Sequence, residues 1–228
     1  MFNTVMFFVT VFVTFGLLTL LAYFFGKEGI FAWVGMAAII ANIFTCKTVN
    51  LFGMSVTLGN ALFGTVFLAT DMLFELYDKN TAKKAVWVAL TVLISATCLT
   101  QLSLIFIPNE FDFAHESMQT LFGILPRITL GSISMFLFSN QLDIYLFDKI
   151  REKTNGKYLW LRNNVATIIS QCIENFLFYT IAFLGVYTLS DILVMAGTLC
   201  IVEIILAFLD TPFLYLIVNK KGKINVED

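Results

Sequence analysis

Long apolar segments alternate with short polar connections along the whole chain. A membrane-spanning helix needs about 20 mainly apolar residues, and the apolar segments have about this length or more. The pattern therefore predicts an all-α, polytopic integral membrane bundle of about seven transmembrane helices. The expected spans are Val5–Phe25, Ile30–Cys46, Thr57–Tyr77, Ala85–Ile107, Thr120–Phe147, Val165–Leu189 and Leu193–Val218.

Three of these spans have individual features. The first, Val5–Phe25, is expected to be an N-terminal addition to a core of six helices. Ile30–Cys46 is short, whereas Thr120–Phe147 is long enough to tilt or to break near Pro126, because proline removes a backbone hydrogen bond from a helix. Together the spans predict a single transmembrane domain over residues 1–228, with no room for a soluble domain.

The composition supports a membrane location. Of the 228 residues, 59% are apolar and only 13% are charged, and the mean hydropathy is +0.86. Soluble domains carry about 25% charged and 45–50% apolar residues. A core of this size cannot enclose so much apolar surface, so most of it must contact the lipid bilayer. The net charge of −2 gives no basis for a nucleic-acid partner.

Basic residues accumulate in every second connection. Cytoplasmic loops of membrane proteins hold the excess of Lys and Arg. The intervening connections contain Lys47 and the acidic residues Glu110, Asp112, Glu116 and Asp191. The alternation predicts a cell-membrane protein with its N-terminus outside and its C-terminus in the cytoplasm. Twelve of the 14 basic residues follow this rule: Lys27, Lys79, Lys83, Lys84, Lys149, Arg151, Lys153, Lys157, Arg162, Lys220, Lys221 and Lys223.

Ionisable residues also occur in or at the edges of the expected spans. An ionisable group at the bilayer centre costs roughly 2.5–3.5 kcal/mol on insertion scales. Glu174 and Glu203 lie near the middle of their spans, so each must face a cavity or a partner inside the bundle. An ion pair with Arg127 is the structural alternative for one of them, but one arginine cannot neutralise six carboxylates. The full set is Lys47, Asp71, Glu75, Arg127, Asp143, Glu174, Glu203 and Asp210.

Two of these acids belong to a repeated motif. Phe138–Asp143, followed by Phe147, parallels Ile169–Glu174, followed by Phe178; both have the order apolar, Ser, amide, two residues, acid, three residues, Phe. The amide and the acid are three residues apart and share one helix face. Antiparallel fifth and sixth spans would present both copies to one cavity, as in transporters with inverted repeats. A carboxylate and a carboxamide together suit a planar amidine or guanine-like edge.

Several classes of membrane protein are disfavoured. The chain has one His, His115, and four Cys without paired spacing, whereas a zinc enzyme needs several ligands at coordinating distances. A retinal protein needs a Lys within a span, and the final span has none. No glycine-rich phosphate loop is present, so ATP would act only through partner subunits. We therefore expect no enzymatic activity, no metal and no cofactor.

Five short motifs occur in order between residues 26 and 218. They are Gly26–Gly29, Phe67–Asp71, Pro126–Ile128, Trp160–Asn164 and Leu209–Phe213. With this hydropathy pattern the chain resembles the queuosine precursor transporters, also called the vitamin uptake transporter family. The resemblance implies uptake of a 7-deazaguanine, either queuine or its cyano or aminomethyl precursor, for modification of tRNA.

The resemblance also implies a substrate site. Two positions depart from the family's usual pattern, because Glu174 stands where Asp is common and Glu203 where Lys is frequent. The expected partners are a small planar heterocycle and the lipid bilayer, and a homo-oligomer is compatible with the sequence. The alternative is a substrate-binding component of an energised uptake complex for another vitamin or heterocycle. The expected substrate-binding residues are Gln171, Glu174, Asn140, Asp143, Arg127, Asp71, Glu203 and Asp210.

Overall fold

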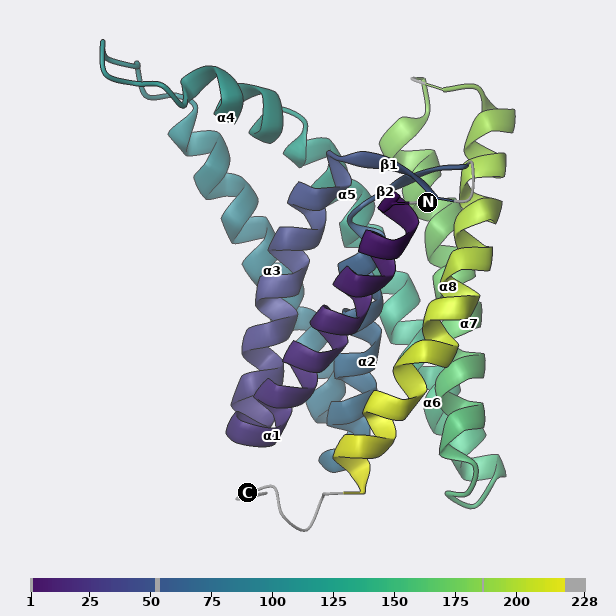
Figure 1. Ribbon diagram of the computed structural model, residues 1–228. Coiled ribbons are helices and arrows are strands. Elements are labelled where there is room, and N and C mark those ends of the chain that lie inside the picture. Colours follow the sequence, from purple (N-terminus) through teal and green to yellow (C-terminus); the bar gives the residue numbers. More distant parts are fainter. Residues whose placement is uncertain (1, 52–53, 186, 220–228) are drawn as a thin grey trace.

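The computed structural model describes residues 2–51, 54–185 and 187–219, most of which lie in helices that run between the two ends of the molecule (Figure 1). The first helix, α1 (Phe2–Thr45), reverses its direction at Gly26, where φ is 55° and ψ is −131°. Glycine reaches this conformation without steric cost. The two halves of α1 lie so close that a Cβ at Gly29 would be 2.4 Å from the carbonyl oxygen of Leu21. The first two expected spans are therefore joined by a tight turn.

A short antiparallel hairpin follows α1. Its strands, β1 (Thr48–Leu51) and β2 (Met54–Thr57), pair Thr48 with Thr57. The prediction of a helix from Thr57 is wrong, because α2 (Asn60–Leu76) begins three residues later, after the second strand. Hydropathy does not separate a short apolar strand from the first turn of an apolar helix.

The helix α2 occupies the centre of the bundle. All of its residues are buried, and it packs against α1, α3, α6 and α8. A helix that is apolar on all sides is typical of such a position. Its carboxylates, Asp71 and Glu75, are therefore held inside the protein.

The segment expected as the fifth span is interrupted twice. It follows α3 (Lys79–Ser103) and consists of α4 (His115–Phe122), α5 (Leu125–Ser134), a π-helical turn η1 (Met135–Ser139) and α6 (Asn140–Lys153). The break near Pro126 is confirmed. Pro126 is the second residue of α5, and proline is tolerated there because the N–H groups of a first turn have no hydrogen-bond acceptor within the helix. The π-helical turn was not predicted. Such turns are frequent at functional sites, and this one directly precedes Asn140.

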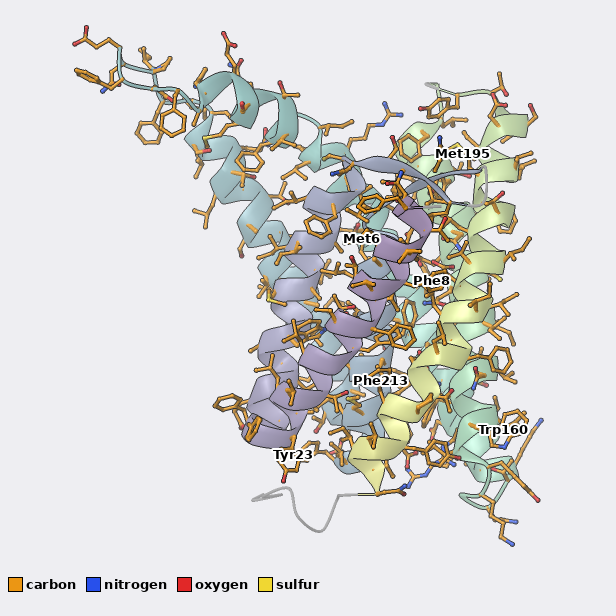
Figure 2. The ribbon with its side chains drawn as sticks, viewed as in Figure 1. Met6, Phe8, Tyr23, Trp160, Met195 and Phe213 are labelled. Carbon is orange, nitrogen blue, oxygen red and sulfur yellow. The ribbon has the colours of Figure 1, made fainter. Side chains whose placement is uncertain are left out.

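The last two helices, α7 (Leu159–Phe183) and α8 (Leu189–Val218), pack against each other as an antiparallel pair (Figure 1). The helix α7 begins at Leu159, six residues before the predicted start of the sixth span at Val165, and the polar residues Arg162, Asn163 and Asn164 in this segment are buried. Figure 2 shows Phe213 of α8 next to the first half of α1, where its ring centroid is 5.4 Å from that of Phe15.

The connections rich in lysine and arginine lie at one end of the bundle, which we call the basic end (Figure 1). At this end the Lys27 ammonium is 5.4 Å from the centre of the Tyr77 ring, and Lys79 pairs with Asp148. The opposite end carries β1 and β2, and we call it the hairpin end. Lys220, Lys221 and Lys223 lie outside the described residues.

The outer surface of the bundle is apolar. Large side chains such as Phe2, Leu99 and Phe208 are exposed, as lipid contact requires. Tyr23 and Trp160 lie near the basic end (Figure 2), a placement typical of a membrane–water interface. The structure is therefore that of an all-α, multi-pass membrane protein. Within the described residues, four helical segments are long and apolar enough to cross a membrane: Phe2–Thr45, Lys79–Ser103, His115–Lys153 and Leu189–Val218.

Candidate functional site

A column of buried polar side chains runs through the interior of this apolar bundle, and we call it the polar axis. Its members come from α2, α6, α7 and α8 and are almost completely shielded from solvent: Asn140 and Asp143 have no exposed surface, and Glu174 is 4% exposed. Many of their polar atoms have no hydrogen-bond partner among the described residues. The members are Asp71, Asn140, Asp143, Asn163, Thr167, Ser170, Gln171, Glu174, Asn175, Glu203 and Asp210.

Three aspartates meet in the part of the polar axis nearer to the basic end, and we call Asp71, Asp143 and Asp210 the aspartate cluster. The Asp143 carboxyl group faces Asp71 and the hydroxyl of Thr167, and Asp210 lies in the same region of the interior. The Asn163 side-chain amide donates to Oδ1 of Asp210 at 2.8 Å. Both carboxyl oxygens of Asp143 lack a hydrogen-bond partner among the described residues. The structure thus brings together three of the predicted site residues.

Two carboxamides occupy the next layer toward the hairpin end. The helices α6 and α7 are antiparallel, and Asp143 of α6 faces Thr167 of α7. One helical turn closer to the hairpin end, Asn140 of α6 therefore lies at the level of Gln171 of α7. Neither amide atom of Asn140, nor Oε1 of Gln171, has a partner among the described residues. Gly64 of α2 leaves space here, since a Cβ on it would be 3.9 Å from Nε2 of Gln171.

Two glutamates form the layer beyond the carboxamides. Glu203 of α8 faces Glu174 of α7 and accepts a hydrogen bond from the side-chain amide of Asn175. Tyr179 lies one turn further along and faces both carboxyl groups. Thr167 and Glu174 are seven residues apart on α7, so this layer is about 10 Å from the aspartate cluster.

The repeated motif therefore has a different geometry from the one expected. Its two amides, on Asn140 and Gln171, lie at the same level, but its two acids lie on opposite sides of them. Asp143 is one turn toward the basic end, and Glu174 is one turn toward the hairpin end. Antiparallel packing of two similar segments produces this arrangement, because the direction from amide to acid is reversed between α6 and α7.

The predicted arginine lies apart from the buried acids. Arg127 is exposed at the start of α5, and its Nη2 donates to the carbonyl oxygen of Leu184 at 2.8 Å. The expected alternative of an ion pair between Arg127 and Glu174 or Glu203 is not found. Instead, Arg162 is buried, and its Nη2 and Nε donate to Oε1 of Glu75 at 2.6 and 3.0 Å.

Sequence reasoning therefore missed the buried Arg162 and several members of the polar axis, among them Asn163, Thr167 and Asn175. Arg162 was assigned to a loop because it adjoins basic residues. The other missed residues do show a signal, since polar side chains recur every three or four positions along α7, which places them on one helix face. That series is Asn163, Thr167, Ser170, Gln171 and Glu174.

The layers define what this interior can bind. A buried polar group without a partner costs about 1–3 kcal/mol, so a ligand that pairs with several such groups gains affinity. The carboxylates accept hydrogen bonds, and the carboxamides both donate and accept them. This interior suits a small planar molecule that carries several N–H and carbonyl groups. The closed polar interior within a lipid-facing bundle is typical of membrane transport proteins.

Comparison with known proteins agrees with this class. Residues 57–217 match the family model described as "Putative vitamin uptake transporter", and the chain belongs to this family. It is 40% identical over 192 residues, 84% of each chain, to a Bacillus subtilis (strain 168) protein named "Probable queuosine precursor transporter".

Two more distant relatives carry similar names. A Haemophilus influenzae protein, also named "Probable queuosine precursor transporter", is 24% identical over 59% of this chain and 54% of its own length. An Escherichia coli (strain K12) protein named "Queuosine precursor transporter" is 24% identical over 63% of this chain and 62% of its own. No solved structure matches the chain at a significant level.

Proposed function

We propose that this protein imports a queuosine precursor, a 7-deazaguanine such as queuine or its cyano or aminomethyl precursor, across the cell membrane. The observation that carries the proposal is the layer of two carboxamides with an acid one turn away on either side. Among the described residues, neither amide atom of Asn140, nor Oε1 of Gln171, has a hydrogen-bond partner. This layer occurs in a chain that is 40% identical to a relative named as a queuosine precursor transporter. A 7-deazaguanine presents a planar edge with N–H donors and a carbonyl acceptor, which these side chains complement.

The proposed binding residues are Asn140, Gln171 and Glu174, with Glu203 beside them. Glu174 accepts hydrogen bonds from the N–H groups of the base edge, and the two carboxamides pair with its remaining donors and acceptors. Glu203 adds a second carboxyl group to this layer. Arg127, exposed near the hairpin end, is proposed to act only at the entrance.

The proposed topology has seven crossings, with α1 contributing one from each side of Gly26. The N-terminus lies outside, and the C-terminus lies in the cytoplasm. The gathering of basic connections at one end of the bundle supports this orientation, since such residues are retained on the cytoplasmic side. In this arrangement the aspartate cluster lies toward the cytoplasm and the glutamate layer toward the exterior.

Transport into lipid vesicles tests the proposal. The purified protein is reconstituted, and entry of labelled queuine and of its cyano and aminomethyl precursors is measured. We expect saturable entry of at least one compound, reduced by an excess of the unlabelled form. Entry no faster than into protein-free vesicles, for all three, contradicts the proposal. Co-purification with an ATPase that is required for entry would instead identify a component of an energised uptake complex.

A further inference from the structure

The aspartate cluster has a different environment from the proposed base-binding layer. Its three carboxyl groups come from α2, α6 and α8, and Asp71, Asp143 and Asp210 are 1%, 0% and 2% exposed. One oxygen of Asp71 and both oxygens of Asp143 lack a hydrogen bond with any described residue. The recognition of a base edge by one acid does not require three further buried carboxyl groups, so the cluster calls for a second explanation.

Among the described residues, no salt bridge joins a cation to the cluster. Glu75 of α2 lies near Asp71, and Arg162, in the first turn of α7, is hydrogen-bonded to Glu75. Arg162 is the one buried Lys or Arg among the described residues, and Glu75 already accepts two hydrogen bonds from it. Three ionised carboxylates in such a desolvated place would be strongly unfavourable.

An independent feature, the hydroxyl of Thr167, points to a ligand. Thr167 is 1% exposed, its side chain faces Asp143, and its oxygen lacks a hydrogen-bond partner among the described residues. A hydroxyl donates to an ionised carboxylate and accepts from a protonated one. Thr167 is therefore suited to an acid that changes its protonation state.

A proton fits this cluster better than a metal ion does. Two carboxyl groups that face each other in a desolvated site favour the binding of a proton, because ionisation of both together is costly. Within the residues that the structure describes, no group of three or more His, Cys, Asp or Glu side chains is arranged to hold a metal ion.

We propose that Asp71, Asp143 and Asp210 form a proton-binding site, distinct from the base-binding layer, which couples substrate entry to proton entry. The inference rests on the proposed transport function. One proton from the external solution binds a carboxylate of the facing Asp71–Asp143 pair and gives a carboxylic acid. Release of this proton to the cytoplasm regenerates the carboxylate, so the site is ready for another cycle.

The two sites are linked by the helices that they share. Asn140 and Asp143 are one turn apart on α6, immediately after the π-helical turn, and Gln171 and Thr167 are one turn apart on α7. A substrate that repositions the carboxamides therefore moves the groups that hold the proton. Arg162 and Glu75 close the polar axis between the aspartate cluster and the basic end, so proton release requires this ion pair to move.

Reconstituted vesicles that contain a pH-sensitive dye test the coupling. Addition of labelled queuine, or of its aminomethyl precursor, should acidify the lumen in proportion to the substrate that enters. In Asp143→Asn and in Asp71→Asn the proton movement per substrate should fall at least tenfold. Asp148→Asn, which removes an acid of α6 at the basic end, is the matched control and should behave like the wild-type protein. Substrate entry without acidification in the wild-type protein overturns the proposal, as does unchanged coupling in both variants.

Infrared spectroscopy of the purified full-length protein gives a second readout that needs no substrate. The wild-type protein at neutral pH should show the carbonyl stretch of a protonated carboxyl group, and Asp143→Asn should lack it while remaining folded by circular dichroism. An unchanged band in Asp143→Asn and in Asp71→Asn overturns the proton site. If a variant transports no substrate, the infrared measurement still shows whether its proton site is intact. Absence of transport by the wild-type protein refutes the proposed function, whereas the infrared result refutes or supports the proton site itself.

Discussion

Arg162 and Glu75 form an ion pair inside the bundle, in which two guanidinium nitrogens donate to one carboxylate oxygen at 2.6 and 3.0 Å. The same guanidinium lies 5.3 Å from the centre of the Phe147 ring, and its Nη1 donates to the carbonyl oxygen of Gly156. These contacts connect α2 with α6, α7 and the connection between them. The pair therefore closes the polar axis at the basic end.

Breaking this pair on one side should destabilise the protein. Arg162→Met leaves the Glu75 carboxylate buried without its cation, which costs about 3–5 kcal/mol. The double variant Glu75→Leu/Arg162→Met removes both charges and should recover most of that loss. Unfolding of the purified protein in detergent measures both changes. Lys149→Met, which breaks the exposed pair with Glu152, is the control and should leave the stability nearly unchanged, because water and salt screen an exposed pair. Equal stability of Arg162→Met and the wild-type protein would contradict this role.

Loss of the Glu174 charge should weaken substrate binding. Hydrogen bonds to a charged acceptor contribute about 1.5–3 kcal/mol each, so loss of two in Glu174→Gln implies an affinity reduced on the order of a hundredfold or more. Equilibrium binding of a labelled 7-deazaguanine to the purified variant checks this. Glu152→Gln, a change at an exposed glutamate of α6, should bind normally. Near-normal binding by Glu174→Gln would leave Glu174 a structural residue.

Glu203 should influence which precursor is preferred. It lies beside Glu174 and accepts a hydrogen bond from Asn175, so this layer presents several acceptor oxygens, which suit a ligand that carries an ammonium group. We expect tighter binding of the aminomethyl precursor than of the cyano precursor, and a reversed preference in Glu203→Lys. Competition binding with the two precursors measures the ratio. The same ratio in the wild-type protein and the variant would show that Glu203 does not sense the charge of the ligand.

The proposed orientation predicts which end is accessible from outside the cell. In a background with the four native cysteines replaced by serine, single cysteines are placed at Lys153 and at Glu116, which lie at opposite ends of the bundle. An impermeant thiol reagent applied to intact cells should label only the cysteine at position 116. Both should react after the cells are permeabilised. Labelling at position 153 in intact cells would reverse the orientation.

The N-cap of α3 should make stability depend on pH. The backbone N–H of Thr81 donates to the Asp78 carboxylate at 2.8 Å and lowers the pKa of that group. Its stabilisation is therefore present above the unfolded pKa of about 3.9, and it is lost as the pH falls through the lower pKa of the folded protein. Asp78→Ala should cost about 1 kcal/mol at neutral pH. Asp78→Asn keeps a capping oxygen without the titration, and an identical acid dependence in this variant would contradict the assignment.

The sequence by itself determined the class of the protein and many of the polar side chains that line its interior. Long apolar segments cannot be hidden within 228 residues, so a lipid-facing helical bundle follows from hydropathy alone. The cost of charge in lipid likewise identified Glu174 and Glu203 as interior groups before any contact was known. The turn at Gly26 and the break before Pro126 were marked by residues with special backbone properties.

The tertiary structure decided which of these groups meet. Arg162 was counted with the loop charges and Arg127 with the interior, and the structure reverses both placements. The repeat on α6 and α7 was visible in the sequence, but the separation of Asp143 from Glu174 depends on the register between two antiparallel helices. Hydropathy is a property of each segment and contains no information on register, which is fixed by packing between segments that are distant in the chain. The layers of the polar axis therefore exist only in the folded bundle.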